Sequence, residues 1–403
     1  MVTGSTAGTT EVVVINQGGL GAATVEGIKI VDVGGASNGV FTLNGDYVFE
    51  GDQAVIAGAY GYRLFQGGTS TPADGDWYLR SALLNAPDEP QAPLYQPGVP
   101  VYEAYGQTLL ALNDLGTMQQ RVGDRQWAPT ESGKASGIWG RMQSNRSRPN
   151  AAFSTSLTDV NVDSWKLELG ADHVLSERSD GAALVVGVLG GYGEANASIG
   201  STFGNGSIKT KGYSAGATLS WFGPQGFYVD GRAQVTWFDS TLKSSVLGTL
   251  ADSNKGTGQA YSVEVGKRSP VGGALSVTPQ MQVVYSKVTF DRFTDPNGAV
   301  VSSQLGDSLK TRWGLSLDHQ DNRSHLYGVA NLSYEWLDGT VTDVSGTPIA
   351  RENHRLWGEL GAGGSVLLGD RLTLYTEASA NTAIDDFGKS YSLKGVAGLR
   401  LAF

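Results

Sequence analysis

The sequence has 403 residues, of which 57 are glycine, none is cysteine and four are histidine, and its formal charge is −10. The lack of cysteine excludes disulfide scaffolds, thiolate zinc sites and cysteine nucleophiles, and the acidic balance argues against a nucleic-acid partner, because phosphate binding needs a concentrated basic face. No apolar run approaches the roughly 18 residues of a membrane helix, and the residues after Met1 lack the basic region and apolar core of a signal peptide, so an exported form is expected to belong to a longer protein.

Residues 1–86 contain short candidate strands separated by turns. Runs rich in β-branched residues, such as 11–15 and 27–33, alternate with stretches of glycine and asparagine. Their close spacing suits the end of a parallel β-helix, although no strict repeat is visible. Aromatic runs at 59–65 and 74–80 would supply a cap for the exposed end of such a helix. A small soluble β-domain on a linker is the other interpretation.

Residues 87–134 connect two regions. Five prolines between positions 87 and 100 exclude regular structure there and mark a boundary. From residue 101 to 122 apolar residues recur three or four positions apart, which predicts a helix that ends at Gly123. A mostly polar helix with one narrow apolar stripe suits a wet pore, and an amphipathic helix packed on a sheet is the alternative. The expected pore-helix residues are Leu109, Leu112, Leu115, Met118, Arg121 and Val122.

Residues 135–403 repeat a strand pattern in which apolar and polar residues alternate. About a dozen such runs, each near the ten residues that cross an outer membrane, predict an all-β fold with a closed transmembrane barrel around the pore helix. The polar set carries both charge signs, which a hydrated lumen tolerates and a dry core does not. The expected lumen-facing residues are Arg141, Lys166, Glu168, Asp230, Arg232, Glu264, Arg312, Arg355, Glu359, Glu377 and Arg400.

The last strand, residues 391–403, has one polar and one apolar face, and the chain stops on an aromatic residue. Either a membrane barrel or the final strand of a soluble β-sandwich could use this pattern. Its apolar face carries Tyr391, Leu399, Leu401 and Phe403.

Three of these stretches resemble the C-terminal part of pertactin-like type V autotransporters: residues 75–81, residues 121–124 and the strand that ends at Phe403. The resemblance implies a twelve-stranded translocator in a Gram-negative outer membrane, with residues before about 100 on the cell surface. Such a unit secretes and anchors its own N-terminal passenger, and its helix plugs the channel after export. The resemblance also implies that an intramolecular chaperone includes Asp76, Trp77, Tyr78 and Leu79.

The same resemblance implies the partners. They are outer-membrane lipid and lipopolysaccharide, periplasmic chaperones, the chain's own passenger, and a barrel assembly machinery that reads the strand ending at Phe403. A monomer is expected.

Two motifs could carry chemistry. Residues 306–309 read Gly-Asp-Ser-Leu, as in the nucleophile block of one esterase family, but a strand follows and no Asp-x-x-His block comes later, so catalysis by Ser308 is not expected. In one autotransporter subfamily a linker asparagine cleaves its own backbone; the aligned positions here are Gly116 and Thr117, and Asn113 is offset.

The four histidines lack metal-ligand spacing, so we expect no metal, no cofactor and no enzyme activity. An outer-membrane barrel hydrolase and a soluble β-rich surface-binding protein remain the alternative functions.

Overall fold

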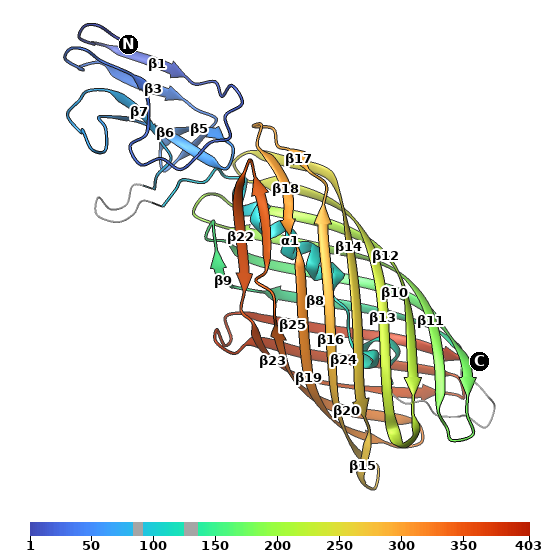
Figure 1. Cartoon of the computed structure of the whole chain (residues 1–403). Coiled ribbons are helices and arrows are strands. Elements are labelled where there is room, and N and C mark those ends of the chain that lie inside the picture. Colours follow the sequence, from blue (N-terminus) through green and yellow to red (C-terminus); the bar gives the residue numbers. More distant parts are fainter. Residues whose placement is uncertain (84–91, 125–135) are drawn as a thin grey trace.

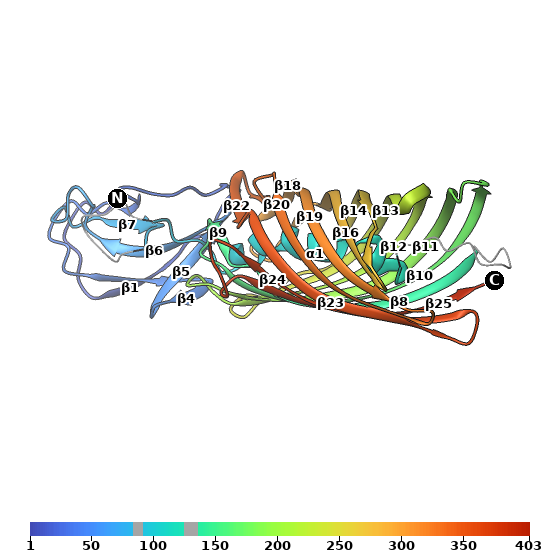
Figure 2. The same ribbon diagram turned by 90° about the horizontal axis from the view of Figure 1, so that it is seen from below.

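The computed structural model describes residues 1–83, 92–124 and 136–403. A long barrel makes up most of the molecule, a helical segment lies inside it, and residues 1–83, the N-terminal unit, project from one end (Figure 1). We name the barrel end beside this unit the upper rim and the opposite end the lower rim. Figure 2 gives a second view, in which the helical segment again lies within the barrel.

The N-terminal unit contains two small sheets. In the first, β1 (Thr9–Val13) pairs in parallel with β3 (Val40–Asn44), and parallel bridges at Val2 and Thr6 keep the same sequence offset, as in two stacked coils of a solenoid. The second sheet is antiparallel, and aromatic side chains occupy much of its buried face. Its order is β2 (Ile28–Val31), β7 (Trp77–Arg80), β6 (Tyr60–Gln66), β5 (Asp52–Ala57) and β4 (Tyr47–Phe49).

The barrel is one sheet of antiparallel strands that closes where β14 pairs with β16. Thirteen strands belong to this sheet; β15 (Ser269–Gly272) pairs only with β16, and the other twelve form the ring. The all-β, twelve-stranded barrel expected from the sequence is confirmed. In chain order the ring strands are β8 (Gly137–Arg148), β10 (Asp159–Glu177), β11 (Ala183–Gly200), β12 (Gly206–Phe222), β13 (Phe227–Ser244), β14 (Gly248–Lys267), β16 (Leu275–Phe290), β19 (Asp307–Gln320), β20 (Ser324–Glu335), β23 (Leu356–Leu368), β24 (Leu372–Ala383) and β25 (Tyr391–Ala402).

The two faces of the barrel wall differ in polarity. Outward apolar side chains are exposed, with Leu169 at 61%, Val188 at 63% and Leu360 at 71%, while polar and charged residues on the inner face are buried. This inverted distribution is what a barrel surrounded by hydrocarbon requires.

Pro279 lies within β16, where a proline removes one ladder donor. The register explains why it is tolerated: β14 pairs with the part of β16 from Gln280 to Phe290, and β15 pairs with the part from Leu275 to Val277. Pro279 therefore occupies the point at which one edge of β16 changes partners.

A further sheet covers the upper part of the lumen. It is built from loops between ring strands, within the region 135–403 that the sequence assigns to the barrel as a whole. Its strands also alternate, so their pattern resembles that of membrane strands. The order is β17 (Phe293–Thr294), β18 (Val300–Leu305), β21 (Thr340–Val344), β22 (Thr347–Asn353) and β9 (Ala151–Ser154).

The lumen holds α1 (Val99–Asn113) and α2 (Met118–Val122), and a single turn, η1 (Pro224–Gly226), lies at the lower rim. The prediction of one continuous helix over 101–122 is wrong. Asp114 has an extended backbone, and Leu115 lies between the two helices. Neither helix in the described ranges combines the length and the apolar character needed to span a membrane.

Candidate functional site

The helical segment lies inside the barrel. The six predicted pore-helix residues are at most 5% exposed: Leu109, Leu112, Leu115, Met118, Arg121 and Val122. α1 contacts the barrel strands β10 to β14 and β16, and α2 contacts β25. Inward-facing glycines make room for it; a Cβ atom at Gly206 would lie 2.3 Å from Val101, and one at Gly258 would lie 2.7 Å from Asn113.

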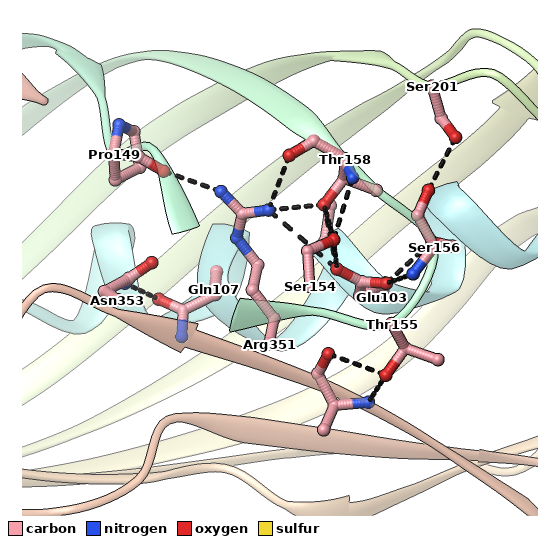
Figure 3. Close-up of polar contacts among 12 residues, drawn as sticks. Glu103, Gln107, Pro149, Ser154, Thr155, Ser156, Thr158, Ser201, Arg351 and Asn353 are labelled. Atoms are coloured by element: carbon pink, nitrogen blue, oxygen red, sulfur yellow. Dashed lines mark hydrogen bonds and ion pairs between the residues drawn. The ribbon is translucent and has the colours of Figure 1, made fainter. Parts of the chain in front are cut away.

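At the upper end, α1 is joined to the barrel by the carboxylate of Glu103, which is 1% exposed (Figure 3). The segment between β9 and β10 supplies its donors: the Ser156 amide at 2.7 Å, the Thr158 hydroxyl at 2.8 Å and the Ser154 hydroxyl. Arg351 on β22, also fully buried, lies 3.9 Å away and donates to the Thr158 carbonyl. We call these five residues the Glu103 cluster. A buried carboxylate needs this number of donors to offset the loss of its hydration.

A second polar contact at the upper end involves Asp295 in the turn between β17 and β18. Its carboxylate accepts hydrogen bonds from the Tyr102 hydroxyl at 2.8 Å and the Gln96 amide at 3.1 Å. Thr342 on β21 donates to the Tyr102 carbonyl at 3.0 Å. The first turn of α1 is therefore fixed by two independent sets of barrel loops.

In the middle of the lumen, α1 ends at Asn113 and the backbone becomes extended at Asp114. The Asn113 amide donates to the Gln259 carbonyl and the Ser286 hydroxyl, at 2.9 and 2.7 Å. Lys166 donates to the Asp114 carbonyl at 2.5 Å. A cation here meets the unsatisfied carbonyls and the negative end of the α1 dipole, so the barrel wall stabilises the break in the helix.

At the lower end, α2 is bound to carboxylates of the barrel wall. Glu264 accepts from the Met118 amide at 3.0 Å, Glu377 accepts from Gln120 at 2.5 Å, and Asp230 forms an ion pair with Arg121. The amide of Met118 is one of the free donors at a helix N-terminus, where a carboxylate is favourable.

The wall itself carries a buried charge network beneath α2. Glu168 accepts from Arg232 at 2.6 Å and from Arg141, which lies directly opposite it in the β8–β10 register. Arg141 also donates to the Gln120 carbonyl at 2.9 Å. The network therefore links β8, β10 and β13 of the wall to α2.

The other predicted lumen residues fall into two groups. Arg312 bonds to Gln282, Glu359 accepts from Asn381, and Arg400 is half-buried on the same face of β25 as Val396. Arg355 precedes β23 and pairs with Asp338 at the upper rim, with 40% of its side chain exposed. It also lines the cavity beside α1, and its place in the lumen stays a prediction.

Sequence reasoning missed Glu103 and Arg351. One signal was present, since Glu103 is the one charged residue in the sequence of α1. Nothing local marks Arg351 as its partner, because the two residues are far apart in sequence and meet through the covering sheet.

The four residues of the predicted chaperone segment lie on or next to β7. Trp77, Tyr78 and Leu79 are less than 10% exposed. The Asp76 carboxylate accepts from Lys29 at 2.5 Å and from the Val33 amide at 2.8 Å, and these bonds lower the pKa of Asp76. The same carboxylate raises the pKa of Lys29.

The residues of the last strand lie at the seam between β25 and β8. Leu399, Leu401 and Phe403 point outward and are 40–57% exposed, and Tyr391 is half-buried. The Phe403 amide donates to the Ser136 carbonyl at 3.0 Å, so pairing continues to the last residue.

The two candidate chemical residues have other partners. The Ser308 hydroxyl donates to Glu335, and the Asn113 amide donates to two barrel acceptors rather than facing its own carbonyl. A cavity of about 250 Å³ remains beside α1, lined by both acidic and basic residues such as Asp114 and Lys394. Among the described residues no group of three or more His, Asp or Glu could hold a metal ion.

Comparison with known proteins assigns this architecture. The model of the autotransporter β-domain family matches residues 138–379, more than half of the chain. The chain belongs to the autotransporter family. A second family model, the type 1 autochaperone domain, matches residues 1–64, a range that ends before Asp76.

The relatives are autotransporters as well. The adhesin BmaC autotransporter of Brucella suis biovar 1 is 46% identical over the whole of this chain, which covers 12% of that relative's length. The crystal structure of the AIDA-I transport unit from Escherichia coli matches with a TM-score of 0.64 at 18% identity, over 75% of this chain and 99% of that one. The translocator domain of NalP from Neisseria meningitidis has a TM-score of 0.53 at 15% identity, over 74% and 92%. These two structures share the fold.

The autotransporter chain is therefore an outer-membrane translocator unit that secretes a passenger, and the passenger side is exposed at the cell surface. The N-terminal unit lies beside the upper rim, so the upper rim is the cell-surface end. The two alternative functions are not favoured.

Proposed function

We propose that residues 1–86 are the autochaperone end of the passenger, that residues 87–134 are the linker and the plug, and that residues 135–403 are the translocator barrel. In this division the segment from α1 to α2 closes the pore after export and anchors the passenger. Asp76, Trp77, Tyr78 and Leu79 then serve the chaperone unit by holding β7 between β2 and β6. The family match to residues 1–64 supports the first part of this assignment.

The Glu103 cluster is the observation that carries the plug proposal. Its carboxylate is buried in the lumen and depends on donors that belong to barrel loops and on the guanidinium of Arg351. Removal of one partner from a buried ion pair costs about 3–5 kcal/mol, because the other charge stays buried without compensation. Withdrawal of α1 from the lumen would break all of these contacts at once, so the cluster favours the plugged state.

The outer surface and the last strand support the proposed partners. The exposed apolar side chains on the outer face of the ring strands, the apolar belt, fit outer-membrane lipid and lipopolysaccharide. The strand that carries Tyr391, Leu399, Leu401 and Phe403 fits a signal for the barrel assembly machinery. Periplasmic chaperones would act before insertion. We propose a monomer with no nucleic-acid partner.

We also propose that the chain is not an enzyme and that its full-length passenger binds surfaces. The relative BmaC is named an adhesin, and Ser308 has a carboxylate as its hydrogen-bond partner.

Conductance of the purified chain in planar lipid bilayers tests the plug. The unchanged chain is expected to stay closed for most of the recording. Glu103→Ala should increase the open fraction, because α1 loses one of its two upper anchors and Arg351 loses its anion. Glu352→Ala, which removes a partly buried glutamate next to Arg351 on β22, is the matched control and should stay closed. A chain lacking residues 99–113 that remains closed would contradict the plug role.

A further inference from the structure

The N-terminal unit touches the upper rim through aromatic rings. Tyr60 on β6 stacks on Tyr95 with centroids 5.6 Å apart, and Tyr95 meets Phe203 edge-on at 5.4 Å. Tyr95 belongs to residues 92–98, the described part of the chain between the N-terminal unit and α1, which we call the connector. Phe203 belongs to the loop between β11 and β12 of the barrel, and it is 3% exposed. Aromatic pairs in these geometries are favourable beyond the area that they bury.

Phe203 completes a hydrophobic core that the N-terminal unit does not complete alone. The core also contains Tyr47, Ala54 and Ile56 of the unit and Leu94 of the connector, all less than 10% exposed. A surface loop rarely gives a large aromatic side chain to the core of another unit, because loops generally run over the surface. The unit and the rim are therefore packed as one structure at this point.

The connector at this junction is held from both sides. The Leu94 carbonyl accepts from the Gly61 amide at 2.9 Å, and the Gln96 amide donates to the Ala59 carbonyl at 3.0 Å, so residues 94–96 extend the sheet of the unit beside β6. On the barrel side, Asp295 binds the Gln96 side chain. The barrel thus fixes residues 94–96, the strand with which the start of β6 pairs.

We propose that the upper rim is a template on which the N-terminal unit folds, with Phe203 as the residue that starts the aromatic core. A strand already fixed by the barrel lowers the entropy that the start of β6 must lose when it pairs with residues 94–96. The barrel then takes part in folding at the cell surface in addition to providing the passage. This role goes beyond the plug, because it depends on rim residues that the Glu103 cluster does not use.

Refolding of the whole 403-residue chain from urea into detergent micelles tests the proposal. Trypsin resistance of Arg63 and Arg80, which are buried in the folded unit, reports on the unit, and migration of unboiled samples in a gel reports on the barrel. Phe203→Ala should slow the gain of trypsin resistance roughly fivefold or more, the change expected when an aromatic contact of a folding nucleus is lost. The rate at which the barrel band appears should not change.

Phe387→Ala is the matched control, since Phe387 lies in the surface loop between β24 and β25 and is 76% exposed. It should behave like the unchanged chain. Equal rates of protection for Phe203→Ala and the unchanged chain would overturn the proposal. If Phe203→Ala reduces barrel assembly itself, Tyr95→Ala replaces it, because this change removes the same contact from the connector side. Slow protection with a normal barrel then supports the template, and normal protection overturns it.

Discussion

Asp76 joins two elements of the N-terminal unit through one carboxylate. It precedes β7, and it accepts hydrogen bonds from Lys29 on β2 and from the amide of Val33 just after that strand. The bond from Lys29 lowers the pKa of Asp76, and the Val33 amide lowers it further. Nearby, burial opposes ionisation of Asp74, but hydrogen bonds from Thr71 and Tyr78 outweigh it and lower the pKa of Asp74 to about 2.

These depressed pKa values predict an acid-sensitive N-terminal unit. Stability from an aspartate with a lowered folded-state pKa is complete above its unfolded value of about 4 and is lost as the pH falls through the folded value. Protection of residues 1–83 against hydrogen exchange, measured by mass spectrometry and taken relative to the intrinsic exchange rate at each pH, should stay high down to about pH 4 and then fall toward pH 2. Asp76→Asn should exchange faster already at pH 7. Glu11→Gln, on exposed β1, is the control, and an equal effect of both changes would contradict the role of Asp76.

At the scale of elements, the plug segment consists of two helices, α1 and α2. The end of α1 needs hydrogen-bond donors for its free carbonyl groups, and the start of α2 needs acceptors for its free amide groups. α1 ends at an extended Asp114 whose carbonyl is satisfied by Lys166. α2 begins with a capping box, in which the Thr117 hydroxyl accepts from the Gln120 amide and the Gln120 side chain accepts from the Thr117 amide. This box satisfies donors that would otherwise be buried and unpaired.

Loss of the cap should therefore loosen α2 alone. Thr117→Ala is expected to cost about 1 kcal/mol of local stability. Hydrogen exchange over residues 118–123 should accelerate about fivefold, the factor that corresponds to this free energy, while the strands keep their protection. Thr249→Ala, an exposed threonine on β14, should leave the exchange of α2 unchanged. Uniform acceleration across the barrel would show that the cap is not a local device.

The same segment illustrates what the sequence can predict. The helix end at Gly123 and the burial of Leu109 and Met118 could be predicted from the spacing of apolar residues. The interruption between α1 and α2 could not, because the spacing of Leu112, Leu115 and Met118 continues through it. The barrel was predictable because alternation is local and is repeated in every strand. The Glu103 cluster was not, because its members come from a helix, a loop and a covering strand whose proximity depends on the closed fold.

At the scale of the whole molecule, one hydrophobic core runs from the N-terminal unit into the barrel. It includes Leu43 and Tyr62 of the unit, Tyr105 of α1, and Ile208 and Phe290 of the barrel. Outside, the barrel presents the opposite surface, an apolar belt with no protein covering it in the described chain. The molecule is therefore built for two solvents, hydrocarbon around the barrel and water around the unit.

This contrast predicts that equal substitutions have unequal effects. Leu360→Arg, in the middle of β23, should destabilise the inserted barrel by about 2–4 kcal/mol, because its charge would face hydrocarbon. Val25→Arg, at a position 87% exposed in the N-terminal unit, should have almost no effect. The amount of heat-modifiable band after membrane insertion measures both. Extraction of the unchanged chain without detergent would contradict the membrane assignment.

The added strand at residues 94–96 has a mechanical consequence. Its hydrogen bonds to Ala59 and Gly61 bypass the chain between residues 62 and 93, and residue 96 is followed closely by α1. Tension on a surface-bound passenger first loads these few bonds. Their rupture would separate residues 94–96 from β6 before the contacts of α1 inside the barrel were broken.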